Sequence, residues 1–236
     1  MLLALAIVLE LVSKMFIPEM PFGGQITLVS MLPVVLISYR HGVRWGLVAG
    51  LGYAMIEMAL GARVVAGAFQ PGYFGDGVML LQAFIMCALD YLAAFTVLGL
   101  GGCFRGKLGK PGTELMLGSI VALGCRYVCH IASGYILFSA WAEWFFTQDG
   151  FPAWGGVLVE SLSPQMLGFV YSLVYNGMYM LPEMLLTAAT DKFVRRFTAM
   201  ENLIISDGKA LGGLTLAEMD VYWNRVKSAQ NCCDTN

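Results

Sequence analysis

Apolar residues run along this chain in long stretches, each interrupted by at most two charged positions. Six stretches qualify as candidate membrane helices, some of them short, because spanning a bilayer takes about 20 mostly apolar residues. They cover residues 1–17, 26–39, 45–61, 77–101, 114–141 and 165–190. Glycine and proline clusters such as "PEMPFGG" and "FRGKLGKPG" separate them and punctuate helices. The pattern predicts an all-α membrane protein built as a bundle of six transmembrane helices.

The composition agrees with a membrane protein and excludes some function classes. Hydrophobic residues make up 58% of the 236 residues and charged residues 13%, against about 45–50% apolar residues in an ordinary soluble domain. The mean hydropathy is +0.70. Because 14 basic residues are balanced by 16 acidic ones, the chain lacks the basic excess that nucleic-acid binding needs. No nucleic-acid partner is expected.

The positions of the basic residues predict the topology. Eight of them fall in alternate connections, whereas the opposite connections hold Arg63 alone. The eight are Arg40, Arg44, Arg105, Lys107, Lys110, Lys192, Arg195 and Arg196. The positive-inside rule therefore predicts cytoplasmic termini and external loops after the first, third and fifth helices of a multi-pass protein.

After Arg196 the composition becomes that of a soluble segment. We expect residues 1–191 to form the six-helix membrane domain and residues 192–236 a cytoplasmic amphipathic tail. Thr215 and Glu218 have the spacing of a capping box ahead of an amphipathic helix. This helix could dock on a partner or have no specific role, and the sequence leaves both open.

Ionisable residues inside the apolar stretches are the first candidates for chemistry. Arg126, His130 and Ser133, with Gly134, share one face of the fifth helix by their spacing. A charge at bilayer depth costs about 3 kcal/mol or more unless it faces protein or water, so this face must look into the bundle. Asp90 in the fourth helix likewise needs a cation, a proton or a hydrogen-bond partner. Arg126 and a bound cationic ligand are both candidate partners.

The sixth helix adds aromatic and amide groups. Tyr171, Tyr175 and Asn176 fall within about one and a half helical turns. The tyrosines offer ring faces and hydroxyl groups, and the asparagine offers donors and an acceptor. With Asp90 and His130 they favour a small, planar ligand that is cationic, held by cation–π attraction and a carboxylate.

Other polar residues receive less specific interpretations. Glu57 and Glu183 lie closer to span ends, where snorkelling to the interface explains them. The cysteines are expected to be free thiols. Cys125 and Cys129 do not converge with His130 on a helix, so no metal site is expected. No nucleophile motif or phosphate-binding loop is recognisable, and no catalytic residue or cofactor is expected.

Four segments in order resemble one family, the thiamine-specific S components (the ThiT family) of energy-coupling factor (ECF) transporters. They are "MPFGGQITLVSMLPVVLISYRHG", "ALDYLAAFTVLGLGGCFRG", "RYVCHIASGYILF" and "YSLVYNGMYMLP", and together they cover most of residues 15–190. The resemblance implies a six-helix protein of the bacterial plasma membrane that captures thiamine from the external side. It also implies a shared transmembrane coupling subunit and two ATPase subunits as partners.

The resemblance assigns roles to individual residues. The family's acidic residue before a tyrosine, often glutamate, matches Asp90, and its histidine matches His130. Its tyrosine and asparagine of the sixth helix match Tyr171 and Asn176. The ligand-binding set expected from the residues and the resemblance together is Gly23, Gly24, Asp90, Tyr91, His130, Phe138, Tyr171, Tyr175 and Asn176. Arg126, one turn below His130, is expected to brace the fourth helix against the fifth.

The chain departs from the family at some ligand positions. Some members have tryptophan where this chain has Gly24 and Phe138, so the aromatic contacts must be shared differently. Gly23 and Gly24 would let the loop backbone approach the ligand closely. Tyr73 is only a distant match for a further tyrosine. A thiamine-binding S component is the leading interpretation. An S component for another small heterocycle, and an intramembrane enzyme using Asp90 and His130 as acid and base, are the alternatives.

Overall fold

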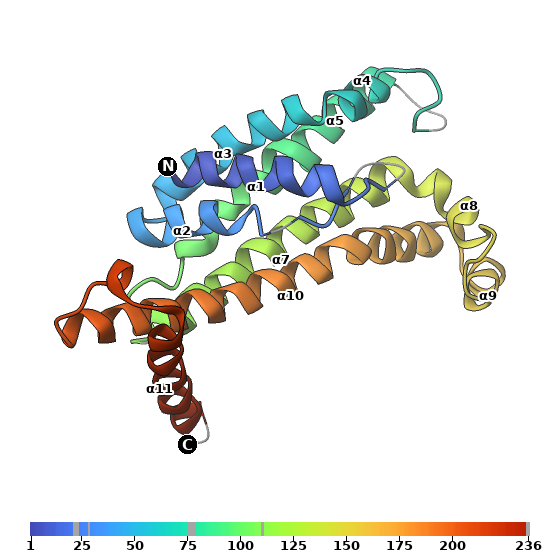
Figure 1. Cartoon of the computed structure of the whole chain (residues 1–236). Coiled ribbons are helices and arrows are strands. Elements are labelled where there is room, and N and C mark those ends of the chain that lie inside the picture. Colours follow the sequence, from blue (N-terminus) through green and yellow to red (C-terminus); the bar gives the residue numbers. More distant parts are fainter. Residues whose placement is uncertain (21–23, 28, 75–78, 110, 235–236) are drawn as a thin grey trace. The chain divides into compact units, whose positions relative to one another are not determined.

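In the computed structural model every regular element of the described residues is a helix, which confirms the all-α class (Figure 1). The structure describes residues 1–20, 24–27, 29–74, 79–109 and 111–234. The chain divides into two compact units, Met1–Thr187 and Ala188–Asn236, which are described separately below.

The first unit begins with four helices of unequal length. They are α1 (Leu2–Phe16), α2 (Leu32–His41), α3 (Val43–Leu60) and α4 (Ala62–Ala68). The prediction of a helix over residues 26–39 is wrong at its start, because α2 begins only at Leu32. The described residues before it, 24–27 and 29–31, are not helical, and the side chains of Gln25 and Thr27 bond to α1 and α10 instead. Tertiary contacts here override a helical apolar pattern.

The predicted fourth span is helical but changes type along its length. It consists of α5 (Met79–Met86), a π-helix η1 (Cys87–Ala93), α6 (Ala94–Thr96) and a 3₁₀-helix η2 (Val97–Gly102). Such π segments within helices occur frequently at functional sites. Asp90 and Tyr91 both lie in η1.

Glycines let the end of this span pack closely on α2 and α3. A Cβ on Gly99 would collide with the backbone of Leu47 in α3. The Ser38 hydroxyl of α2 donates to the Gly99 carbonyl and accepts from the Gly102 backbone N–H at 2.8 Å. Only glycine leaves room for backbones to approach this closely.

Two long helices run antiparallel along the unit, α7 (Pro111–Phe138) and α10 (Pro164–Ser206) (Figure 1). The Tyr127 hydroxyl donates to the Leu173 carbonyl at 2.7 Å. The Ser172 hydroxyl donates to the Ile131 carbonyl, also at 2.7 Å. The connection between the helices contains η3 (Ser139–Trp141), α8 (Ala142–Phe146) and α9 (Trp154–Ser161). The sixth predicted span, residues 165–190, is therefore part of a longer helix.

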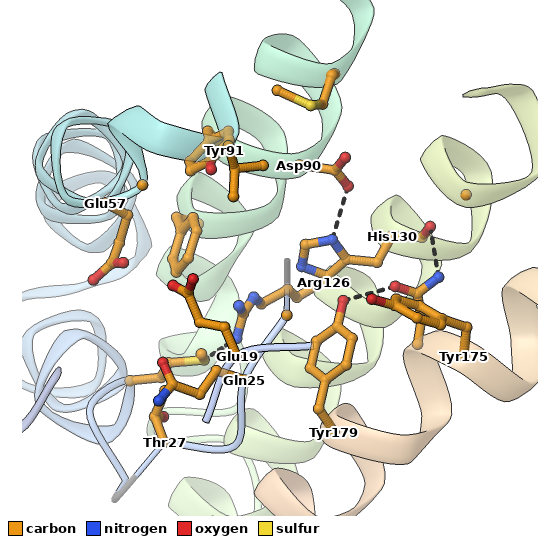
Figure 2. A pocket seen from close by; sticks show the side chains of 18 of the residues that line it. Glu19, Gln25, Thr27, Glu57, Asp90, Tyr91, Arg126, His130, Tyr175 and Tyr179 are labelled. Atoms are coloured by element: carbon orange, nitrogen blue, oxygen red, sulfur yellow. Dashed lines mark hydrogen bonds and ion pairs between the residues drawn. The ribbon is translucent and has the colours of Figure 1, made fainter. Parts of the chain in front are cut away.

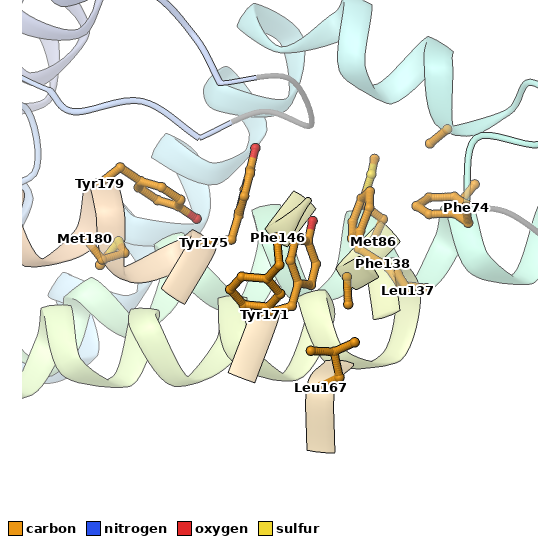
Figure 3. Close-up of a cluster of buried hydrophobic side chains, with 13 residues drawn as sticks. Phe74, Met86, Leu137, Phe138, Phe146, Leu167, Tyr171, Tyr175, Tyr179 and Met180 are labelled. Carbon is orange, nitrogen blue, oxygen red and sulfur yellow. The ribbon is translucent and has the colours of Figure 1, made fainter. Parts of the chain in front are cut away.

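Among the described residues, three helical segments are long and apolar enough to cross a membrane: Val43–Leu60, Met79–Gly102 and Gly112–Phe146. An apolar cluster packs where α5, α7 and α10 meet (Figure 3). In it Phe138 of α7 and Met86 of α5 lie near Tyr171 of α10. Aromatic side chains thus gather around one end of the cavity described below.

The second unit consists of the last part of α10, η4 (Leu211–Gly213) and α11 (Leu216–Asp234). Its core is formed by Met200, Ile204, Tyr222 and Val226. The capping box predicted ahead of α11 is present. Glu218 accepts from the Thr215 backbone N–H at 2.9 Å and donates its own N–H to the Thr215 hydroxyl at 3.4 Å. These bonds from Thr215 lower the pKa of Glu218.

Candidate functional site

A cavity in the first unit collects polar side chains from α1, α3, η1, α7 and α10 and from the non-helical residues before α2 (Figure 2). All predicted ligand-binding residues that the structure describes line it. They are Gly24, Asp90, Tyr91, His130, Phe138, Tyr171, Tyr175 and Asn176. Gly23 lies outside the described residues.

Asp90 and His130 form the polar centre of this cavity. His130 Nδ1 lies 2.9 Å from Asp90 Oδ1, and the Ser133 hydroxyl donates to Asp90 Oδ2 at 2.6 Å. The partner of Asp90 in the protein is thus His130 rather than Arg126. Asp90 lies in the π-helix η1 and faces α7. The Tyr91 side chain packs directly against Gly61, where a Cβ would lie 2.5 Å from the Tyr91 hydroxyl oxygen.

His130 presents one ring nitrogen to the cavity. Its side chain is 9% exposed, and among the described residues Nε2 is buried without a hydrogen-bond partner. When the neutral ring donates a hydrogen bond from Nδ1–H to Asp90, Nε2 is an acceptor. A carboxylate behind a histidine fixes the tautomer and the ring orientation. The pair can therefore accept a hydrogen bond from an amino group of a ligand.

Arg126 bonds to α10 rather than to Asp90. Its Nη1 lies 3.4 Å from Glu183 Oε2, and the Thr27 hydroxyl donates to the other oxygen of Glu183. The snorkelling prediction for Glu183 is wrong: the side chain is fully buried, because α10 continues to Ser206 and places Glu183 well inside the helix. The Arg126 guanidinium also lies 4.4 Å from the centre of the Phe95 ring, so it contacts both α6 and α10.

A second ionic cluster joins α1 to α3. Lys14 Nζ lies 3.6 Å from Glu10 Oε1 and 3.5 Å from Glu57 Oε2. The Tyr53 hydroxyl donates to Glu10 Oε2 at 3.4 Å. Glu57 is 4% exposed, so the snorkelling prediction is wrong here too, because α1 covers it. The cluster was missed, although Glu10 and Lys14 have the spacing of an ion pair within a helix.

Tyr179 is another lining residue that sequence reasoning missed. Its hydroxyl donates to Asn176 Oδ1 at 2.7 Å, and its ring meets that of His130 edge-on with 5.9 Å between centres. Asn176 Nδ2 donates to the carbonyls of His130 and Ser172 at 3.1 and 2.9 Å. Tyr179 follows Tyr171 and Tyr175 at intervals of four residues, a helical spacing that was the available signal.

The aromatic end of the cavity contains two of the departures from the family pattern. Gly24 has φ +88°, and a Cβ there would lie 2.6 Å from the Tyr179 ring, so the backbone passes directly over this tyrosine. Phe138 packs edge-on against Phe74 and Tyr73, with ring centres 5.2 and 6.1 Å apart. Burial, and then the negative charge of Asp90, raise the pKa of the Tyr73 hydroxyl. Through its edge-on ring contact, Tyr73 packs against Phe138 at this end of the cavity.

Negative charge predominates along the cavity. Among the described residues, its lining includes the carboxylates of Glu10, Glu19, Glu57 and Asp90 but only two cations, Lys14 and Arg126. A cavity with this imbalance attracts cations. The described part of the chain contains no group of three or more His, Cys, Asp or Glu residues that could hold a metal ion, and Cys125 and Cys129 are free thiols.

Residues 1–198 match the model of the family described as Thiamine transporter protein (Thia_YuaJ). The chain belongs to this family. It is 29% identical over 194 residues to the thiamine transporter ThiT of Bacillus subtilis (strain 168), a match covering 78% of this chain and 81% of that protein. These findings confirm the resemblance: the chain is a membrane protein for thiamine transport rather than an enzyme. The alternative of an acid–base enzyme is set aside.

A shorter match concerns a different kind of protein. Over 46 residues the chain is 48% identical to the nucleoside triphosphate pyrophosphohydrolase/pyrophosphatase MazG of Thermotoga maritima. This match covers 20% of this chain and 18% of that protein. It is too short to show a family or an activity.

Proposed function

We propose that this chain is the thiamine-binding S component of an ECF transporter. It captures thiamine from the external side of the bacterial plasma membrane and delivers it together with a transmembrane coupling subunit. Two ATPase subunits supply the energy, since no phosphate-binding loop is recognisable in the chain itself. The membrane domain is a six-helix bundle with both termini in the cytoplasm, which accords with the eight basic residues of alternate connections.

The Asp90–His130 pair is the observation that carries the proposal for the site. Its buried Nε2 acceptor matches the amino group of an aminopyrimidine such as that of thiamine. The carboxylates around the cavity compensate the thiazolium charge. Tyr171, Tyr175 and Phe138 offer ring faces and edges for the planar parts of the ligand. Gly24, with its φ of +88°, lets the loop before α2 approach the ligand closely.

Binding of thiamine to the purified protein tests the ligand. We expect saturable quenching of tryptophan or tyrosine fluorescence by thiamine, and no competition by riboflavin or biotin. The thiamine recovered after long incubation should be chemically unchanged, because the site supplies no activated nucleophile. Competition by riboflavin at similar concentrations would favour an S component for another heterocycle.

Co-purification tests the partners. An affinity-tagged chain expressed with a transmembrane coupling subunit and its two ATPase subunits should isolate all four, and reconstituted vesicles should accumulate thiamine only with enclosed or added ATP. Uptake by the chain alone, without these subunits, would contradict the ECF mechanism while leaving thiamine transport intact.

A further inference from the structure

We propose that the cavity has a second recognition end, formed by Glu57 and Gln25, which binds a hydrogen-bond donor on the part of the ligand remote from the Asp90–His130 pair. The inference rests on the proposed thiamine site. It deepens that proposal by defining the ligand as an elongated cation that carries a planar ring at one end and a hydroxyl group at the other.

Unpartnered acceptors at this end of the cavity are the first evidence. Glu57 is 4% exposed and Gln25 is 8% exposed. Glu57 Oε1 and Gln25 Oε1 are buried oxygens without a hydrogen-bond partner in the part of the chain that the structure describes. Both residues line the same cavity as His130, whose Nε2 shares this property. Buried polar atoms are nearly always hydrogen-bonded, so these oxygens are expected to meet a donor.

The two side chains are held in place by their other polar atoms. Gln25 Nε2 donates to the carbonyls of Ser13 and Ile17 at the end of α1, which leaves its oxygen as the free end of the amide. Glu57 Oε2 pairs with Lys14, which leaves Oε1. A preorganised acceptor binds a ligand donor without first losing side-chain freedom.

Charge selects the kind of donor. Glu10 and Glu57 share the single ammonium group of Lys14, so the cluster retains one negative charge if both carboxylates are ionised. A hydroxyl or cationic group is favoured beside it, and an anionic group is repelled. In Figure 2 Arg126 lies between Glu57 and His130, so the two recognition ends flank the guanidinium. On thiamine the hydroxyl of the hydroxyethyl substituent, remote from the aminopyrimidine, is the matching donor.

A cycle of protein and ligand variants tests this inference. The ligands are thiamine and an analogue in which ethyl replaces hydroxyethyl, titrated calorimetrically into the full chain. For the wild type we expect the analogue to bind about tenfold more weakly or worse, since a hydrogen bond to a charged group is lost. In Glu57→Gln this penalty should shrink severalfold, because a neutral acceptor makes a weaker bond. Gln25→Met, which keeps Glu57, should also reduce the penalty.

Glu10→Gln is the matched control. Glu10 is equally buried and pairs with the same lysine, but both of its oxygens have partners, Lys14 and Tyr53. Its substitution removes charge but no free acceptor, so it should reduce the analogue penalty clearly less than Glu57→Gln does. An equal penalty in all variants, an equal shift in Glu10→Gln, or equal wild-type affinity for both ligands would overturn the inference. In these outcomes thiamine still binds, whereas failure of the wild type to bind thiamine would overturn the proposed function as well.

Discussion

Arg126 of α7 and Glu183 of α10 form an ion pair, with 3.4 Å between Arg126 Nη1 and Glu183 Oε2. Their side chains are 7% and 0% exposed. Removing one partner of a buried ion pair leaves an uncompensated charge. We therefore expect Glu183→Ala to lower the free energy of unfolding by about 3 to 5 kcal/mol. The measurement is thermal unfolding of the detergent-solubilised protein, together with the yield of monodisperse protein.

The Arg225–Asp207 pair provides the matched control. Arg225 Nη1 lies 3.5 Å from Asp207 Oδ2, but the two side chains are 57% and 39% exposed. Solvent screens such pairs, so Arg225→Gln should change stability by no more than about 1 kcal/mol. Similar losses in both variants would mean that burial of the Arg126–Glu183 pair has no special importance.

Tyr179 should act on affinity by positioning Asn176. Tyr179→Phe removes the hydroxyl that donates to Asn176 Oδ1 and leaves the ring in place. We expect thiamine affinity to fall about fivefold, equivalent to about 1 kcal/mol for one hydrogen bond. Tyr127→Phe, which removes a hydroxyl that donates to the Leu173 carbonyl on the exposed side of α7, should leave affinity unchanged. Equal affinities in both variants would exclude the positioning role.

Gly24 combines a left-handed backbone with a close contact. Gly24→Ala should cost about 1 kcal/mol for its φ of +88° and additionally displace the Tyr179 ring. Gly72 has a similar φ of +80°, but a Cβ added there would meet nothing within 4 Å. Gly72→Ala therefore measures the cost of the backbone conformation alone. The prediction is a loss of thiamine affinity in Gly24→Ala only. Weaker binding by both variants would point to backbone strain rather than to Tyr179.

The cap of α11 should respond to pH. Because hydrogen bonds from Thr215 lower the pKa of Glu218, the ionised carboxylate stabilises the helix above the ordinary pKa of 4.5. This contribution is lost as the pH falls through the lowered value. Amide hydrogen exchange in the first turn of α11, corrected for the intrinsic pH dependence, should reveal more opening under those acidic conditions. Glu218→Gln should abolish this response, and an unchanged response would show that another group titrates.

The apolar pattern was sufficient to predict most helices, because long apolar runs satisfy their backbone groups only as helices in lipid. Where side chains make specific tertiary bonds, the pattern failed. Gln25 and Thr27 bond to α1 and Glu183, so these residues before α2 are not helical. The π-helix around Asp90 has no recognisable pattern in the sequence.

The site was partly predictable for a related reason. The cost of burying a charge indicates that Asp90 and His130 must face protein, and the structure places both in one cavity. The partner of each charge cannot be deduced from one sequence. Arg126 was a candidate for Asp90 but pairs with Glu183, whose position depends on how α7 and α10 align. Glu57 likewise pairs with Lys14 of a distant segment.

Calorimetric titration of thiamine into the wild type, Asp90→Asn and His130→Ala tests the central claim most directly. Asp90→Asn should weaken binding by about 2 kcal/mol or more, since a buried charge partner is removed. His130→Ala should weaken it by about 1 to 2 kcal/mol through the lost acceptor. Wild-type affinity in both variants would contradict the account and place the thiamine site elsewhere in the protein.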